Sequence, residues 1–185
     1  EDFECAINEI KEKYPQGEIY GTPADVTKKE DIQKVLKMVA SDLGGIDILI
    51  NNAALPADGI TESTFEDYKY VIDTNITGYL AFAEEAVSQM KEKKSGHIIN
   101  IGSMSAETKG PTSTIYVTTK AAIRAFSTSL RKEINPLGIK VSLIEPGAVT
   151  SDMQSGTREE HQEKIDKMEM LEAEDIAMSV VFCLS

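Results

Sequence analysis

Tyr116 and Lys120 are residues whose types and spacing point directly to chemistry. They lie four positions apart in a segment with helical periodicity, so both side chains occupy one helix face, one turn apart. A phenol titrates near pH 10, and a cation within about 4–6 Å favours its charged form. The pair could therefore act as a general acid/base near neutral pH. Alone, Tyr-x-x-x-Lys is a weak signal, because most such pairs are exposed helix neighbours.

Ser103 is a second candidate, because it directly follows a predicted strand and its hydroxyl can face the same cleft. A hydroxyl there could polarise a carbonyl oxygen that the tyrosine protonates, which stabilises the negative charge that develops during a reduction. Ser105 is an alternative for this role. Either serine could instead serve only to cap the loop.

Two asparagine-containing segments extend the pattern. The run Asn51-Asn52-Ala53-Ala54 follows a predicted strand with small side chains, where a planar ring could approach the backbone, and with amides that could brace neighbouring strands. An ordinary Asn-rich turn is the alternative. Asn75 lies at a predicted break between two helical stretches, where it could free a backbone carbonyl for a water or simply mark the break.

The elements that would position these residues alternate between strands and helices. Apolar patterns and turn residues predict strands at Ile19 to Val26, Ile46 to Ile50, His97 to Ile101 and Lys140 to Ile144. Helices are predicted before Pro15, after a Thr27/Glu30 capping box, from Phe65 with Thr64 as its cap, from a break near Asp73 to about Lys94, from Pro111 to Pro136, and at the end of the chain. Residues 102–110 and 151–169 are expected to be irregular.

This alternation predicts an α/β fold, a doubly wound parallel sheet of the Rossmann type, with helices on both faces. We expect a single domain over residues 1–185. In such sheets ligands bind beyond the carboxyl ends of the strands, so the loops after Ile50, Ile101 and Ile144 are where a site is expected.

Composition narrows the class of partner. The net charge of −12 argues against nucleic acid or an anionic membrane as the main partner, since both select basic surfaces. No apolar run approaches the roughly 20 residues that span a bilayer, so we expect a soluble, cytoplasmic protein. His97 and His161 have no ligand-spaced neighbours, and no metal site is expected.

Taken together, the motifs resemble those of the short-chain dehydrogenase/reductase family. The resemblance is carried, in order, by Asn51-Asn52-Ala53-Ala54, Asn75-x-x-Gly78, Ser103, Tyr116-x-x-x-Lys120 and Pro146-Gly147. It implies a catalytic tetrad: Asn75 holds a relay water, Ser103 orients the substrate oxygen, Tyr116 exchanges its proton, and Lys120 lowers the tyrosine pKa and binds the nicotinamide ribose. It also implies that NAD or NADP is held by Asp25, Val26, Asn52, Ala53, Ala54, Tyr116, Lys120, Pro146, Gly147, Val149 and Ser151.

The resemblance further implies hydride transfer between a secondary alcohol and a carbonyl of a small molecule, in a homodimer or homotetramer. The family opens with a strand and a Gly-rich phosphate-binding turn and adds a final strand, none of which this sequence contains. We therefore expect a domain without the first βαβ unit and the last strand, from a longer protein of which this sequence is a truncation or only the ordered part. A non-catalytic nucleotide-binding or scaffold protein of the same fold is the main alternative. A serine hydrolase using Ser103 and Lys120 ranks last, because the Gly-x-Ser-x-Gly elbow is missing.

Overall fold

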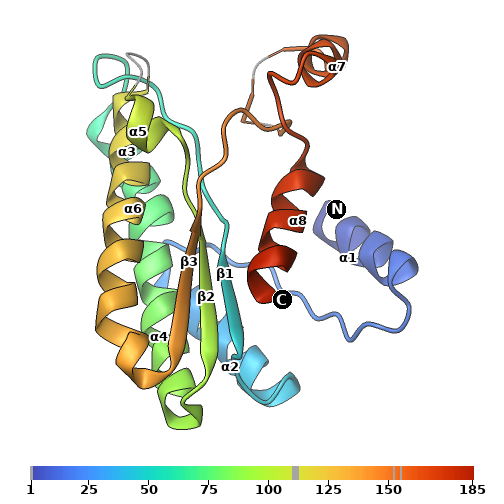
Figure 1. Cartoon of the computed structure of the whole chain (residues 1–185), viewed down its shortest axis with the longest axis vertical. Helices are drawn as coiled ribbons and strands as arrows, with labels where there is room; N and C mark the ends of the chain where they lie inside the picture. The colour runs from blue at the N-terminus through green and yellow to red at the C-terminus, as the bar shows by residue number, and fades with distance from the viewer. Residues whose placement is uncertain (1, 110–112, 152, 155) are drawn as a thin grey trace. The chain divides into compact units, whose positions relative to one another are not determined.

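The structure is a computed structural model that describes residues 2–109, 113–151, 153–154 and 156–185 (Figure 1). The chain divides into two compact units, Glu1–Gly45 and Ile46–Ser185, and each is described by itself. The single-domain organisation expected from the sequence stays a prediction.

The first unit contains the helices α1 (Asp2–Lys13) and α2 (Lys29–Asp42), joined by irregular chain. The strand predicted at Ile19 to Val26 is wrong, because a strand needs a hydrogen-bonded neighbour and the described residues of this unit include none. The predicted Thr27 capping box is also wrong. The Thr27 hydroxyl donates to the Asp25 carboxylate at 2.7 Å, and α2 starts one residue later, after Lys28.

The second unit is built on a parallel sheet with the order β1 (Ile48–Asn51), β2 (Gly96–Ile101) and β3 (Ile139–Ile144). The central strand β2 is almost entirely buried, since both of its edges are paired. The register pairs Asn51 with Asn100 and Ile101 with Ile144, so all three strands end at the same edge. This edge is where the sequence places the candidate residues.

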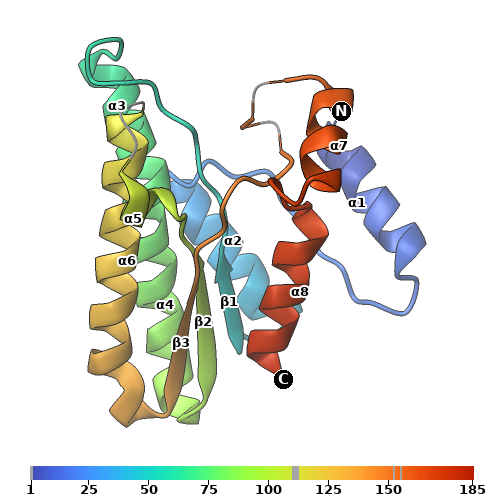
Figure 2. The same ribbon diagram turned by 45° about the horizontal axis from the view of Figure 1, so that its top comes forward.

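Helices cover both faces of this sheet. α4 (Gly78–Lys93) and α6 (Thr114–Ile134) pack on one face, and α8 (Ala173–Leu184) lies on the other in both views (Figures 1 and 2). Ala86 and Met90 of α4 are fully buried and form a core with Ile98 and Ile99 of β2. The predicted α/β doubly wound parallel fold is confirmed.

The break predicted near Asp73 is a π-helical turn. α3 (Phe65–Ile72) starts with a Thr64 capping box, which confirms Thr64 as its cap. It continues into the π-helix Asp73–Thr77, where the Gly78 N–H reaches the Asp73 carbonyl five residues back. The chain therefore widens by one residue at this point and does not stop.

Two segments predicted to be irregular contain short helices. Residues 102–109 include α5 (Ser105–Thr108), and residues 151–169 include α7 (Arg158–Asp166), which has its own capping box at Thr157. The 3₁₀ turn Asn135–Leu137 follows α6. α6 begins at Thr114; Gly110 and the predicted helix start at Pro111 lie outside the described residues.

Candidate active site

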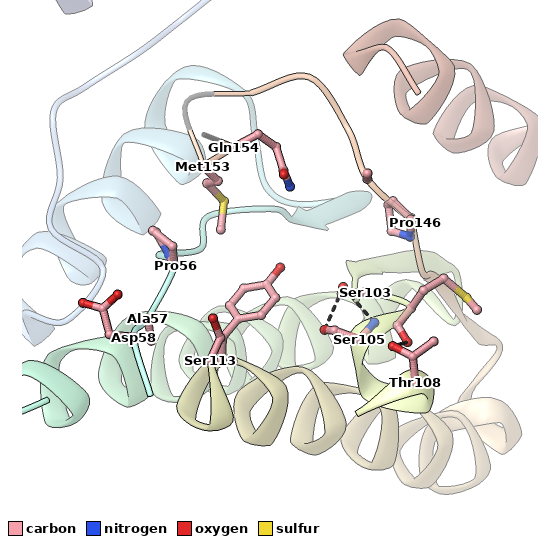
Figure 3. Close-up of a pocket in the computed structure, with 14 residues that line it drawn as sticks. Pro56, Ala57, Asp58, Ser103, Ser105, Thr108, Ser113, Pro146, Met153 and Gln154 are labelled. Carbon is pink, nitrogen blue, oxygen red and sulfur yellow. Dashed lines mark hydrogen bonds between the residues drawn. The ribbon is translucent and has the colours of Figure 1, made fainter. Parts of the chain in front are cut away.

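A cavity of about 780 Å³ lies where the three strands end. Residues that follow each strand contribute to its wall: Pro56 after β1, Ser103 and Ser105 after β2, and Pro146 after β3. Figure 3 shows Ser103, Ser105 and Pro146 on one side of it and Pro56 and Asp58 on the other. Tyr116 from the first turn of α6 also lines the cavity, so the structure brings Ser103 and Tyr116 together as the sequence predicts.

The Ser103 hydroxyl is held in place by its neighbour Ser105. Its oxygen accepts hydrogen bonds from the Ser105 N–H at 3.2 Å and from the Ser105 hydroxyl at 2.9 Å. Both bonds use Ser103 as the acceptor, so its own O–H can be donated into the cavity. The arrangement favours Ser103 as the donor and Ser105 as its support.

Lys120 lies behind the cavity wall, with only 2% of its surface exposed. Its Nζ donates to the Ile101 carbonyl at 3.0 Å and lies 5.6 Å from the centroid of the Tyr116 ring. The i, i+4 spacing predicted from the sequence therefore places the ammonium over the ring of the tyrosine.

Burial shifts the pKa of both members of the pair. It raises the pKa of Tyr116, and the hydrogen bond with Ser103 offsets only part of this. That Lys120 lowers the pKa of Tyr116 stays a prediction. Burial lowers the pKa of Lys120 to about 8. Both shifts have the same cause, because a site with little water disfavours the charged form of either group.

Asn75 is buried in the π-helix and fastens two elements of the site to each other. Its Oδ1 accepts from the Leu55 N–H at 2.7 Å, while its Nδ2 donates to the Leu55 carbonyl at 2.9 Å and to the Thr119 hydroxyl at 3.1 Å. The loop after β1 is thereby joined to α6 one residue before Lys120. The fully buried Thr119 was missed in the sequence, although its position next to Lys120 was a signal.

Asn51 braces the sheet, as its amide led us to expect. Its Nδ2 donates to the Asn100 Oδ1 at 2.9 Å, and the Asn100 Nδ2 donates to the Ser127 hydroxyl of α6, also at 2.9 Å. This buried chain of polar groups links β1, β2 and α6. Of the residues that follow Asn51, Asn52 and Ala53 are exposed and Ala54 is half-buried.

The remaining predicted cofactor residues fall in three places. Pro146 and Gly147 line the cavity, whereas Val149 and Ser151 are outside the described lining, and Val149 forms an isolated bridge with Leu171. Asp25 and Val26 belong to the first unit. There, hydrogen bonds from the Thr27 side chain and N–H lower the pKa of Asp25.

The part of the chain that the structure describes holds neither a membrane-spanning helix nor a metal-binding cluster. No helix in that part is long and apolar enough to cross a bilayer. The same residues hold no cluster of three or more His, Cys, Asp or Glu side chains suited to a metal ion.

The sequence is similar to a known protein family and to two bacterial oxidoreductases. Residues 1–162 match the short chain dehydrogenase family. An uncharacterized oxidoreductase of Staphylococcus aureus (strain MRSA252) is 35% identical over 180 residues, which cover 97% of this chain and 75% of the relative. An uncharacterized oxidoreductase of Staphylococcus epidermidis is 39% identical over 163 residues, or 88% of this chain and 68% of the relative.

Solved structures agree with these matches. A short-chain dehydrogenase from Streptomyces avermitilis superposes with a TM-score of 0.73 at 29% identity, over 82% of this chain and 56% of the other. NAD+-bound xylitol dehydrogenase gives 0.73 at 29% identity, over 80% and 57%. ElxO with NADP bound shares the fold, with a TM-score of 0.78 at 24% identity over 95% and 75%. The nicotinamide cofactor expected from the sequence is of the class that the last two contain, and the chain belongs to the short chain dehydrogenase family of oxidoreductases.

Proposed function

We propose that this protein interconverts a secondary alcohol and a carbonyl by hydride transfer with NAD or NADP, and that Tyr116 is its general acid/base. One observation carries the proposal. Tyr116 and Ser103 line the same cavity, with the buried Lys120 ammonium directly behind the tyrosine ring.

The residues at the cavity fit a nicotinamide. Gly147 leaves open space, since a Cβ added there would meet no atom within 4 Å, so a flat ring can approach the backbone after β3. We assign the carboxamide end to Pro146, Gly147, Val149 and Ser151, and the ribose to Tyr116 and Lys120. Asp25, Val26, Asn52, Ala53 and Ala54 are assigned to the adenosine end.

In the reducing direction, Ser103 donates a hydrogen bond to the carbonyl oxygen of the substrate and Tyr116 donates its proton to the same oxygen. A reduced nicotinamide held by the residues assigned above would supply the hydride for the carbonyl carbon. The raised pKa of Tyr116 keeps the phenol protonated at neutral pH, which is the form that reduction uses. Lys120 holds a positive charge beside the phenolate that remains. Asn75 positions α6 through Thr119. In this proposal Asn75 also holds the relay water that passes protons to the site.

A non-catalytic protein of the same fold is the competing hypothesis. Such a protein has no need of a hydroxyl, a phenol and a buried ammonium at one cavity, and burying an ammonium lowers the stability of the fold. The presence of all three groups favours the enzyme.

The test is the absorbance of the reduced nicotinamide. Protein made from the complete coding sequence is mixed with NADH or NADPH and a panel of small ketones, beside Tyr116→Phe and the control Tyr70→Phe, which removes a half-exposed hydroxyl from α3. We expect turnover that falls about 10²–10⁴-fold in Tyr116→Phe only. Clear cofactor binding without turnover across the panel would favour the non-catalytic hypothesis.

We also propose a small-molecule substrate, a cytoplasmic location and a homodimer or homotetramer. The acidic composition supports a protein that works in solution and away from anionic lipid. Large apolar side chains on α3 and α4 are exposed and support self-association: Phe65 at 59%, Tyr70 at 50% and Leu80 at 42%. Light scattering of the purified protein gives its mass and decides the oligomeric state.

A further inference from the structure

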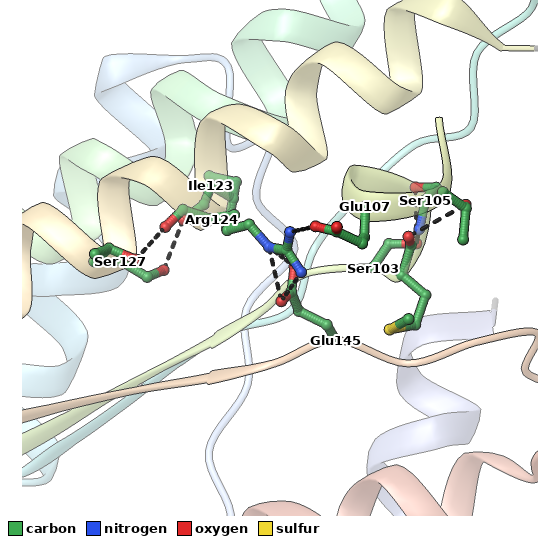
Figure 4. Close-up of polar contacts among 10 residues, drawn as sticks. Ser103, Ser105, Glu107, Ile123, Arg124, Ser127 and Glu145 are labelled. Atoms are coloured by element: carbon green, nitrogen blue, oxygen red, sulfur yellow. Dashed lines mark hydrogen bonds and ion pairs between the residues drawn. The ribbon is translucent and has the colours of Figure 1, made fainter. Parts of the chain in front are cut away.

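Arg124 of α6 lies one helical turn beyond Lys120 and joins two carboxylates from different elements (Figure 4). Its Nε donates to both oxygens of Glu145, at 2.9 and 3.0 Å, and its Nη2 lies 2.9 Å from the Glu145 Oε2. Its Nη1 pairs with Glu107 of α5. One guanidinium on the helix of Tyr116 and Lys120 therefore binds the segment after β2 and the segment after β3.

Glu145 stands directly before Pro146 and packs over Gly102. A Cβ on Gly102 would come within 2.9 Å of the Glu145 Cγ, so the glycine leaves room for this side chain. Backbone bonds hold the same two segments together: the Gly102 N–H donates to Ile144 at 2.7 Å and the Met104 N–H donates to Pro146 at 2.9 Å. Ser103 stands between these two bonds.

The two carboxylates differ in exposure. The Glu145 side chain is 17% exposed and the Arg124 side chain 35%, whereas that of Glu107 is 61% exposed. The forked geometry with Glu145 is specific to arginine, because a lysine cannot donate two parallel bonds. The pair with Glu145 is thus the stronger link and the pair with Glu107 is an exposed addition.

We infer that Arg124 is a positioning residue, which sets the distance of the Ser103 segment and the Pro146-Gly147 segment from the helix that carries Tyr116 and Lys120. This inference rests on the proposed function. Ser103 and Tyr116 come from different elements, and a displacement of about 1 Å between reacting groups can lower a rate about 10²-fold. Arg124 itself lies outside the described lining of the cavity, so it acts through the groups it holds.

The experiment compares Arg124→Met with Lys93→Met. Lys93 forms an ion pair of 2.7 Å with Asp47, which precedes β1 at the opposite end of the sheet, so its loss is a matched control. In Arg124→Met we expect kcat to fall about 10–100-fold per folded molecule while KM changes less than about 3-fold. Hydrogen exchange should quicken in residues 102–109 and 145–148. Lys93→Met should leave kcat, KM and the hydrogen exchange of these residues unchanged.

Two more variants separate positioning from stability. Arg124→Lys keeps the charge without the fork and should recover only part of kcat. In the double variant Arg124→Met/Glu145→Gln the loss should be smaller than the product of the two single losses, because both remove the same link. A lower Tm with unchanged kcat per folded molecule in Arg124→Met would overturn the inference.

Hydrogen exchange also tests the positioning role of Arg124 independently of the proposed function. If the wild-type protein shows no nicotinamide-dependent turnover, the proposed function fails, and exchange still decides the role of Arg124. Faster exchange in residues 102–109 of Arg124→Met alone supports the positioning role. Equal exchange there in Arg124→Met and Lys93→Met refutes it.

Discussion

The Lys120 ammonium and the Tyr79 hydroxyl donate hydrogen bonds to the same atom, the backbone oxygen of Ile101, at 3.0 and 3.2 Å. The rings of Tyr79 and Tyr116 lie 5.8 and 5.6 Å from the Lys120 Nζ. The ammonium is thus held at the end of β2 between two aromatic rings and a neutral carbonyl. Such an environment positions a charge well and solvates it poorly, which is why burial lowers its pKa.

The first prediction concerns the pH dependence of reduction. Lys120 has a pKa of about 8 and must be protonated to stabilise the phenolate of Tyr116, so we expect kcat/KM for carbonyl reduction to decline above about pH 8. A series of initial rates from pH 6 to pH 10, with the cofactor saturating at each pH, measures this. A profile that stays level to pH 10 would contradict the role given to Lys120.

The second prediction concerns the stability of Lys120→Met. A pKa lowered from 10.5 to about 8 corresponds to about 3 kcal/mol of unfavourable free energy in the folded state below pH 8. The variant should lose turnover but be more stable than the wild type. At pH 7 its free energy of unfolding, measured by urea titration, should be higher by about 1–3 kcal/mol.

The pH dependence of this difference has a definite sign. Between pH 8 and 10.5 the unfolded wild-type chain binds more protons at Lys120 than the folded chain, so wild-type stability rises with pH relative to the variant. The advantage of Lys120→Met should therefore shrink when the urea titration is repeated at pH 10. A wild-type protein more stable than Lys120→Met at both pH values would refute the prediction.

The third prediction separates Ser103 from Ser105. Ser103→Ala removes the hydroxyl proposed to stabilise the substrate oxygen and should lower kcat about 10²–10³-fold. Ser105→Ala removes one of the two donors to Ser103 and should cost less than about 10-fold, since the Ser105 N–H remains. Steady-state kinetics on both variants checks the order, and a larger loss in Ser105→Ala would exchange the two roles.

The fourth prediction concerns Asn75. Asn75→Ala leaves the N–H and the carbonyl of Leu55 and the hydroxyl of Thr119 without the amide that bonds them. We expect the free energy of unfolding to fall by about 2–4 kcal/mol. Urea unfolding measures it, with the exposed Asn52→Ala as the control, for which a change below about 0.5 kcal/mol is expected. Similar losses in the two variants would contradict the role of Asn75 as a link.

The longer helices and the three strands of the sheet could be predicted because their signals are local. Ile98 and Ile99 read as a buried strand in any context, and Thr64 followed by Asp67 forms a helix cap within one turn. The segment from Ile19 to Val26 is less apolar and contains Gly21 and Pro23. Whether it becomes a strand also depends on a pairing partner that a local pattern does not contain. Thr27 failed as a cap because Asp25 competes for its hydroxyl.

The candidate residues could be predicted for a similar reason, and their connections could not. Helical spacing indicates Tyr116 and Lys120, and the position directly after a strand indicates Ser103. The bond of Arg124 to Glu145 joins residues 21 positions apart, and that of Asn75 to Thr119 joins residues 44 positions apart. Such contacts follow from how α6 packs on the sheet. The available signal for Arg124 was its position one turn after Lys120, next to a motif already recognised.

The π-helical turn at Asp73–Thr77 has a consequence for insertions and deletions. In an α-helix each residue advances the rotation by about 100°, and the π-helical turn takes up one extra residue within a single turn, so α4 keeps its orientation relative to α3. If the extra residue were wound into a regular α-helix instead, α4 would rotate, and Ala83, Ala86 and Met90 would turn away from the sheet. An insertion within α4, where no such turn takes up the added residue, should therefore disrupt this packing more than a one-residue deletion in Asp73–Thr77 that spares Asn75.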